Sequence, residues 1–288
     1  MLVPPFEMHV AKSVEDAILL RSEFGDDASF YCGGTELVLV MKLGLTDLAH
    51  LIDIKHVDEL RTISIDDSGI RIGAAVTYRE IENNPLLAAD RPEFVSMISG
   101  IANIRVRSVG TLGGNLAFAD PSSDPATYLL AVGGELEIGS ADGKRRIVPM
   151  DGFHTGPYQP NMQDNEMIVS VRLPRNVTGG VVVHERMKLK ERPNITVAVF
   201  ASAVKGKVTQ ARVAVGSVGL VPVRFDEVDA TLVGIEASTL DERLLRAATI
   251  ARDSISLFDD ANGSVEYKRH LVDHFVQKVA RKAIEAVL

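Results

Sequence analysis

The feature that most constrains the fold of this chain is a change of hydrophobic pattern near residue 176. Before it, short apolar stretches of strand type alternate with helical ones. After it, alternating stretches typical of strands are followed by helical periodicity up to the last residues. The polar, glycine-rich segment 176–180 separates the two patterns. Strands followed by helices are typical of α+β folds, so we expect one domain at 1–176 and a smaller α+β domain at 177–288.

The first part of the chain predicts a βαβ arrangement followed by further strands and helices. Ser13 and Asp16 have the spacing of a helix capping box. The glycine-rich stretch 110–124 is predicted to be a loop. Periodicity predicts helices at 14–24, 92–99 and 125–131, a short amphipathic segment at 35–42, and strands at 48–54, 60–65, 70–76, 135–138, 146–148 and 167–173. In the second part it predicts strands at 181–188, 195–204 and 208–218, and helices at 223–232, 240–256 and 265–287.

Two segments carry paired glycines between apolar elements, Gly33-Gly34 and Gly113-Gly114. Two adjacent residues without a Cβ allow backbone N–H groups to approach and surround an anion. A dinucleotide pyrophosphate would fit such a paired cradle. Neither segment matches G-x-G-x-x-G or the P-loop motif, so tight turns that bind nothing remain the alternative on loop chemistry alone.

The segment after the second glycine pair carries two carboxylates, Asp120 and Asp124, on a turn bounded by prolines. An acidic side chain close to a nucleotide-binding loop can accept hydrogen bonds from ribose hydroxyls. Asp124 directly precedes Pro125 and also fits a helix N-cap. The spacing alone leaves both roles open.

Charge and composition argue against several classes of function. The chain has 31 basic and 39 acidic residues, a net charge of −8, which disfavours a nucleic-acid partner or an acidic membrane surface. No apolar stretch approaches the roughly 20 residues of a membrane-spanning helix, and no signal-peptide pattern is visible. We therefore expect a cytoplasmic protein without an integral membrane segment. The single cysteine, Cys32, allows no intrachain disulfide and no iron–sulfur cluster held by this chain alone.

The seven histidines do not indicate a metal site in the sequence. Only His270 and His274 have the i,i+4 spacing of a helical metal pair, and the glutamate of H-E-x-x-H is missing. We interpret these two as surface or packing residues and predict no metal ligand on this chain. A nucleophile elbow, G-x-S-x-G, is also absent, so no catalytic residue is predicted.

An ordered series of motifs extends almost from end to end of the chain and includes SVEDAILL, CGGTELVLVMKLG, IRIGAAVTYREIE, VRSVGTLGGNLAFADPSSDP and EYKRHLVDHFVQKVAR. In these motifs the chain resembles the FAD-binding medium subunit of molybdenum hydroxylases, the family of the carbon monoxide dehydrogenase flavoprotein and the xanthine dehydrogenase flavin domain. The resemblance implies a two-lobed FAD-binding domain of the PCMH type, as in vanillyl-alcohol oxidase, with lobes at about 1–55 and 56–176. The α+β domain at 177–288 would then be of the CO dehydrogenase flavoprotein type, with an antiparallel sheet and carboxyl-terminal helices.

The resemblance also implies which residues bind FAD. Segment 32–36 is similar to the family's A-G-G-(H/T)-(S/D/E) loop, and segment 111–115 to T-(I/L)-G-G-(N/S); both bind the FAD pyrophosphate and neighbouring atoms in the family. Cys32 stands where alanine is usual. The implied ligands in the two segments are Cys32, Gly33, Gly34, Thr35 and Glu36, and Thr111, Leu112, Gly113, Gly114 and Asn115.

Three further residues match single positions of the family pattern. Asp124 matches the carboxylate that holds a ribose of FAD, and Ile168 an aliphatic side chain near the isoalloxazine. Lys188, four residues before Arg192, matches the lysine of a K-x-x-x-R segment that approaches the flavin. A cation there would stabilise the negative charge of reduced flavin. Residues 193–195 replace a segment that often contains Asp and Tyr, which leaves open the residue that covers the flavin ring.

The resemblance implies a flavoprotein subunit that transfers electrons within a larger complex. A large subunit would bind the molybdenum cofactor, and a small subunit would hold two [2Fe–2S] clusters. Electrons would pass through FAD on this chain to an external acceptor, in a dimer of heterotrimers. The alternatives are a self-sufficient flavin-dependent oxidoreductase of the same fold and an FAD-free assembly subunit. The substrate and the electron acceptor stay open.

Overall fold

The computed structural model describes residues 3–175 and 179–288, and the chain divides into two compact units. The first unit comprises Met1–Phe118, Glu135–Pro149 and Pro160–Leu173, and the second comprises Ala119–Gly134, Met150–Gln159 and Pro174–Leu288. Each unit therefore combines segments that are far apart in the sequence.

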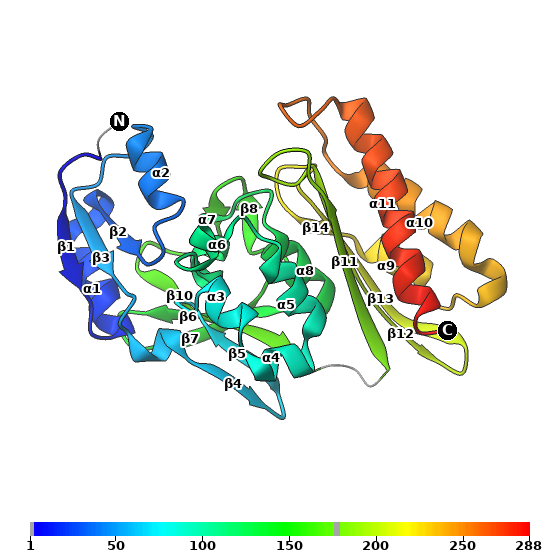
Figure 1. Ribbon diagram of the computed structural model, residues 1–288, viewed down its shortest axis with the longest axis horizontal. Coiled ribbons are helices and arrows are strands. Elements are labelled where there is room, and N and C mark those ends of the chain that lie inside the picture. Colours follow the sequence, from blue (N-terminus) through cyan, green and yellow to red (C-terminus); the bar gives the residue numbers. More distant parts are fainter. Residues whose placement is uncertain (1–2, 176–178) are drawn as a thin grey trace. The chain divides into compact units, whose positions relative to one another are not determined.

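The first unit begins with a three-stranded parallel sheet, drawn in blue in Figure 1. Its elements are β1 (Glu7–Val10), α1 (Val14–Phe24), the 3-10 turn η1 (Gly25–Asp27), β2 (Ala28–Tyr31), α2 (Leu37–Lys42) and β3 (His50–Asp53). β3 lies between β1 and β2 and runs parallel to both, as a βαβ arrangement requires. Ser13 caps α1 by accepting a hydrogen bond from the Asp16 amide, while the Asp16 carboxylate accepts one from the Lys12 amide.

The remainder of the first unit is built on a five-stranded sheet with the order β4-β5-β10-β6-β7. Its strands are β4 (Ile63–Asp66), β5 (Gly69–Gly73), β6 (Glu135–Ser140), β7 (Arg145–Pro149) and β10 (Glu166–Pro174). The accompanying helices are η2 (Asp58–Arg61), α3 (Tyr78–Glu82), α4 (Pro85–Asp90), α5 (Pro92–Ser99), α6 (Ile104–Arg107) and α7 (Leu112–Phe118). β10 is the central strand, so a late segment of the chain joins β5 to β6.

The prediction of a loop over residues 110–124 is wrong for its middle part, because helix α7 occupies Leu112–Phe118. Gly113 and Gly114 lie inside this helix, and glycine has a low helix propensity. Propensity alone therefore did not predict a helix here. Gly113 packs directly against the chain at Ala74, where a Cβ on Gly113 would lie 2.4 Å from the Ala74 Cβ. Close packing against a neighbouring segment has therefore outweighed local propensity.

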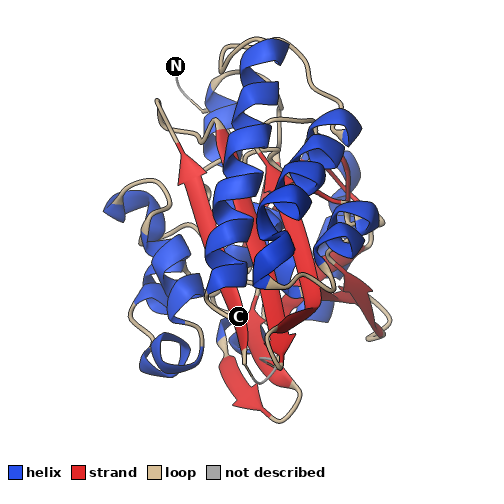
Figure 2. Ribbon diagram, turned by 90° about the vertical axis from the view of Figure 1, so that its right-hand side faces the viewer, coloured by secondary structure: helices blue, strands red, loops and turns tan. Residues whose placement is uncertain are grey.

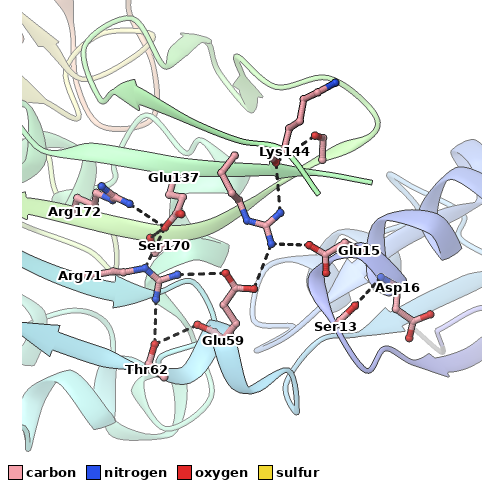
Figure 3. Close-up of polar contacts among 12 residues, drawn as sticks. Ser13, Glu15, Asp16, Glu59, Thr62, Arg71, Glu137, Lys144, Ser170 and Arg172 are labelled. Carbon is pink, nitrogen blue, oxygen red and sulfur yellow. Dashed lines mark hydrogen bonds and ion pairs between the residues drawn. The ribbon is translucent and has the colours of Figure 1, made fainter. Parts of the chain in front are cut away.

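A polar network joins α1 to the five-stranded sheet inside the first unit (Figure 3). Glu137 of β6 accepts hydrogen bonds from Ser170 Oγ at 2.6 Å and from Arg71 Nε at 3.1 Å. Burial raises the pKa of Glu137, but these two donors outweigh it and hold the pKa below its ordinary value. Arg145 of β7 reaches Glu15 of α1 at 2.7 Å. The network thus connects the parallel sheet's helix to the larger sheet through charged side chains.

The second unit contains a four-stranded antiparallel sheet with the order β11-β12-β13-β14, and Figure 2 shows helices lying across its strands. The strands are β11 (Gly180–Met187), β12 (Ile195–Val204), β13 (Lys207–Gly216) and β14 (Val223–Arg224). The helices are α8 (Asp124–Val132), α9 (Asp226–Leu232), η3 (Ala237–Thr239), α10 (Leu240–Ser254) and α11 (Val265–Glu285). Two short strands, β8 (His154–Gly156) and β9 (Gln159–Pro160), pair with each other.

Both faces of the four-stranded sheet are covered. Ile195, Val197 and Val199 of β12 share a hydrophobic core with residues of α9, α10 and α11. The alternate side chains point to the opposite face, where Thr196 bonds to Asp124 of α8. Burial on both faces explains why β12 is a nearly continuous apolar stretch in the sequence.

The α+β class, with an antiparallel sheet and carboxyl-terminal helices in the second part, is confirmed by these sheets and helices. Residues 176–178, part of the predicted boundary segment 176–180, lie outside the described residues. The compact units place Ala119–Gly134 and Met150–Gln159 with the carboxyl-terminal residues, so the division at 176 remains a prediction. No helix of the described chain is long and apolar enough to cross a membrane.

Candidate functional site

A cavity of about 320 Å³ in the first unit brings the two glycine-rich segments together. Its size is in the range of small-molecule sites. Ten of the predicted FAD ligands line this one cavity: Cys32, Gly33, Gly34, Thr35, Glu36, Thr111, Gly113, Gly114, Asn115 and Ile168. Leu112 is not among its lining residues and is fully buried in α7. Asp124 and Lys188 belong to the second unit.

The first glycine segment forms a tight loop between β2 and α2. Gly34 has a φ of +66°, in the left-handed region that favours glycine. In the described part of the chain, the amide N–H groups of Gly33, Gly34 and Thr35 donate no hydrogen bond to protein atoms. Successive unbonded amides in such a turn form a concavity that favours an anion. This loop therefore offers the paired-glycine cradle expected from the sequence.

The second glycine segment has a different role, because its amides are already bonded. The Gly113 amide donates to the Ala74 carbonyl at 3.0 Å, and the Gly114 amide donates to Thr111 Oγ1 at 3.1 Å. The expectation that both segments turn free N–H groups toward an anion is therefore wrong for these two amides. In this segment the missing Cβ atoms allow close packing of the chain instead.

The two segments also touch each other through their backbones. A Cβ on Gly33 would lie 2.1 Å from the Val109 carbonyl oxygen, just before the second segment. Thr111 in turn forms an antiparallel bridge with Thr77. Gly33 is therefore required for contact between the two segments, in addition to any contact with a ligand.

Apolar side chains complete the wall of the cavity, and sequence reasoning found only Ile168 among them. Ile168 and Met167 come from β10, next to an irregularity in its pairing with β6. Further apolar lining residues come from several other elements: Phe30, Ile54, Ile101, Phe118 and Met162. No local pattern marks these residues, because only the tertiary fold brings them to one surface.

Cys32 lines the cavity as a neutral thiol. Burial raises its pKa to about 11, against a hydrogen bond with Thr111 that acts in the opposite direction. A thiol with such a pKa is a poor nucleophile near neutral pH. Cys32 therefore fills space in the loop, where the related pattern has alanine.

In the second unit, both carboxylates of the proline-bounded turn form ion pairs. Asp124 is paired with Arg186 of β11 and accepts a hydrogen bond from Thr196 Oγ1 at 2.7 Å. Asp120 is paired with Arg192. Both carboxylates are buried, and an arginine partner is what makes a buried carboxylate tolerable.

The helix N-cap role considered for Asp124 is taken by its neighbour. Ser123 Oγ accepts a hydrogen bond from the Ala126 amide, and Asp124 is the first residue of α8. His184 Nε2 lies 3.8 Å from Asp124 Oδ1. Burial lowers the pKa of His184 and keeps its imidazole neutral near neutral pH. The positive charge beside Asp124 is therefore that of Arg186.

Lys188 begins an ordered turn between β11 and β12, and its side chain is exposed. Asn194 organises this turn. Its backbone N–H donates to the Met187 carbonyl at 2.8 Å, and its side-chain Oδ1 accepts from the Leu189 backbone N–H at 3.0 Å. The Asn194 side-chain amide also donates to the Asn262 carbonyl at 2.9 Å. Asn194 lies in the segment where the chain departs from the related pattern, and here it fixes the loop.

Comparison with known proteins identifies the class of this fold and site. The chain matches the family described as FAD binding domain in molybdopterin dehydrogenase over residues 4–176. It matches the CO dehydrogenase flavoprotein C-terminal domain over residues 191–283. The fold and the cavity are thus those of a flavoprotein whose first domain is built to bind FAD.

Similar proteins extend along the whole chain. The carbon monoxide dehydrogenase medium chain of Hydrogenophaga pseudoflava is 31% identical over 285 residues, with 98% of each chain covered. The nicotine 6-hydroxylase medium subunit of Paenarthrobacter nicotinovorans is 30% identical, with 98% of this chain and 99% of that protein covered. The chain belongs to this family of FAD-binding medium subunits of molybdenum hydroxylases.

Solved structures agree with this assignment. Carbon monoxide dehydrogenase from Hydrogenophaga pseudoflava matches with a TM-score of 0.95 and 31% identity, covering 100% of both chains. Quinoline 2-oxidoreductase from Pseudomonas putida 86 matches with a TM-score of 0.91 and 26% identity, covering 100% of this chain and 99% of the other.

Proposed function

We propose that this chain is the electron-transfer subunit of a molybdenum-containing hydroxylase. In the proposed complex, a small subunit carries two [2Fe–2S] clusters and a large subunit binds the molybdenum cofactor, as a dimer of heterotrimers. FAD supplies the redox chemistry when bound, because it can take electrons from the clusters and give them to an external acceptor. The observation that carries this proposal is the cavity in which the Gly33-Gly34 loop, α7 and β10 meet.

The residues of the cavity fit the two chemically different parts of FAD. The unbonded amides of Gly33, Gly34 and Thr35 suit the pyrophosphate, since they offer donors without a competing acceptor in the protein. The apolar wall that includes Ile168 suits the flat isoalloxazine and excludes water from it. Without the unbonded amides the site would bind the pyrophosphate poorly, and without the apolar wall it would bind the isoalloxazine poorly.

Asp124 and Lys188 are proposed as further FAD contacts on the family pattern. Asp124 already binds Arg186 and Thr196, but a carboxylate has about four acceptor positions and can accept a ribose hydroxyl as well. Lys188 is exposed at the start of a turn that Asn194 holds in place. An ammonium group there can stabilise negative charge on a reduced cofactor.

The single cysteine supports the division into subunits, because no iron–sulfur cluster can be held by this chain alone. Relatives called medium chain or medium subunit occur with carbon monoxide dehydrogenase, nicotine 6-hydroxylase and glyceraldehyde dehydrogenase. Such different substrates on similar medium subunits favour a large subunit as the place of substrate choice. A cytoplasmic location remains part of the proposal.

Expression of the chain alone and with its neighbouring genes tests the proposal. We expect a yellow protein that binds FAD, does not oxidise substrate alone, and co-purifies with two further subunits. A colourless chain that takes up no added FAD would instead identify an assembly subunit. A yellow chain that turns over substrate without partners would identify a self-sufficient oxidoreductase.

A further inference from the structure

Three potential metal ligands meet at one end of the parallel sheet in the first unit. β1 and β3 are neighbours in a register that pairs Glu7 with His50. His9 lies two residues after Glu7 on β1, so its side chain points to the same face. The parallel register thus brings the imidazole of His50 to the carboxylate of Glu7 and to the imidazole of His9, which lies 41 positions earlier in the sequence.

The atoms of this cluster are close to the spacing that a metal ion requires. His9 Nε2 and His50 Nδ1 lie 3.0 Å apart. Glu7 Oε2 lies 3.7 Å from His50 Nδ1 and 4.0 Å from His9 Nε2. Tetrahedral zinc with bonds of about 2.0–2.1 Å needs neighbouring ligand atoms roughly 3.3 Å apart. Shifts of less than about 1 Å would therefore place all three atoms around one ion.

Phe24 holds the two imidazoles in place. Its ring stacks on His50 with centroids 4.0 Å apart and on His9 with centroids 4.5 Å apart. Phe24 is the last residue of α1, and the carboxyl end of a helix carries partial negative charge that favours a cation. The His9 and His50 side chains are 22% and 23% exposed, so an ion can reach them from solvent.

The geometry points to a site for a divalent transition metal, with Zn²⁺ as the ion best suited to two imidazoles and a carboxylate. The ligands are Glu7 Oε2, His9 Nε2 and His50 Nδ1, with the remaining coordination position open to water. The site is separate from the FAD cavity: His50 begins β3, whereas the cavity residue Ile54 follows the end of that strand. The metal clamps the edge strand β1 to the central strand β3. The sequence predicted no metal ligand, because no spacing motif marks these residues. The parallel pairing of β1 and β3 brings the three ligands together.

Zinc binding by the chain, produced without a polyhistidine tag and freed of metal by a chelator, tests this inference. We expect one Zn²⁺ per chain in equilibrium dialysis, and a higher melting temperature with Zn²⁺ than without it. Glu7→Gln and His9→Gln should each weaken zinc binding by at least about tenfold, since loss even of outer-shell partners costs 10–100-fold. Glu7 is 76% exposed, so its substitution leaves the fold intact.

The matched control is His270→Gln, which removes an exposed histidine on α11 with i,i+4 spacing to His274. This variant should bind zinc as the unchanged chain does. Failure to bind one zinc per chain would overturn the inference, and so would zinc binding that Glu7→Gln and His9→Gln leave unaltered. Loss of zinc only in His270→Gln would place the ion on α11 and also overturn it. The FAD content of each variant reports separately on the flavin site.

Discussion

At the scale of single residues, Gly34 combines a backbone and a packing requirement. Its φ of +66° is a conformation that side chains other than glycine adopt with strain. A Cβ at this position would also lie 2.6 Å from Cε2 of Tyr31. The sequence suggested that Gly34 lets the backbone approach a phosphate. The structure adds that the loop itself, with its unbonded amides, depends on this glycine.

Gly34→Val should therefore abolish FAD retention. The branched Cβ is strained at this φ by about 1–2 kcal/mol or more and displaces the amides that face the cavity. The measurement is the ratio of flavin to protein after purification. Gly143→Val is the matched control, because Gly143 also has a positive φ, of +76°, but nothing lies within 4 Å of its Cβ position. A Gly34→Val protein with the full flavin content would show that the cradle is misplaced.

Asp229 in α9 is a second residue whose environment has a measurable consequence. Burial raises its pKa to about 6, although the Val213 amide and Arg224 act in the opposite direction. The folded protein thus binds this proton more tightly than the unfolded chain, whose ordinary pKa is 3.8. The corresponding stabilisation is present at acidic pH and is lost as the pH rises from about 4 through about 6.

We expect Asp229→Asn to remove this pH dependence. Relative to the variant, the unchanged protein should lose roughly 1–3 kcal/mol of stability between about pH 4 and pH 7. Urea unfolding midpoints of both proteins across this range provide the measurement. Asp226→Asn is the control, since Asp226 also pairs with Arg224 but its side chain is 90% exposed. If the unchanged protein instead gained stability relative to Asp229→Asn as the pH rises from about 4 to about 7, the raised pKa of Asp229 would be contradicted.

At the scale of elements, α11 carries a buried lysine that anchors a loop. Lys268 Nζ lies 2.8 Å from Asp260 Oδ2 and 2.9 Å from the Phe258 carbonyl oxygen, and it stacks over the Phe258 ring. The same loop supplies the Asn262 carbonyl that accepts from Asn194. The helix therefore supports, through this loop, the turn that begins at Lys188.

Lys268→Met should destabilise the protein by about 1.5–3 kcal/mol, because it removes the ammonium that bonds to the Phe258 carbonyl and pairs with the partly exposed Asp260, and so frees the loop. Thermal unfolding of the purified chain measures the effect. Lys278→Met is the matched control: this lysine of the same helix pairs with Glu185 at 2.7 Å, but its side chain is 41% exposed. An exposed pair contributes at most about 1 kcal/mol. Equal losses for the two variants would contradict a special role of Lys268.

At the scale of the whole molecule, the compact units do not follow the division of the sequence at residue 176. α8 is fully buried, and it packs on the face of the four-stranded sheet that includes Thr196 and Ala198. The carboxyl-terminal residues by themselves would leave that face uncovered. The second unit therefore needs an element from the first half of the chain to complete its core.

A fragment of residues 177–288 should consequently fail to fold as a soluble monomer. An uncovered apolar sheet face promotes aggregation, so we expect association in size-exclusion chromatography and no cooperative unfolding transition. Co-expression with a fragment of residues 1–176, which supplies α8, should restore solubility. A monomeric 177–288 fragment that unfolds cooperatively would show that α8 is dispensable for this core.

Local patterns predicted most long elements well. The helix predicted at 14–24 and the helix predicted at 92–99 have the bounds of α1 and α5. The strand meander of the second part has the expected order. Capping residues, glycines and proline mark the ends of these two helices in the local sequence. Their bounds could therefore be predicted without knowledge of the tertiary fold. The α7 helix was missed because its stability comes from the packing of Gly113 on Ala74.

The sequence by itself determined the α+β class, the family, and the glycine segments that line the cavity, because each depends on short motifs or on local periodicity. Only the tertiary structure decided which amides of those segments stay unbonded and which apolar side chains form the wall. It also decided that Asp124 pairs with Arg186, and that His9 meets His50. These contacts join residues tens of positions apart, and the pairing of strands and packing of helices that create them leave no mark in local sequence.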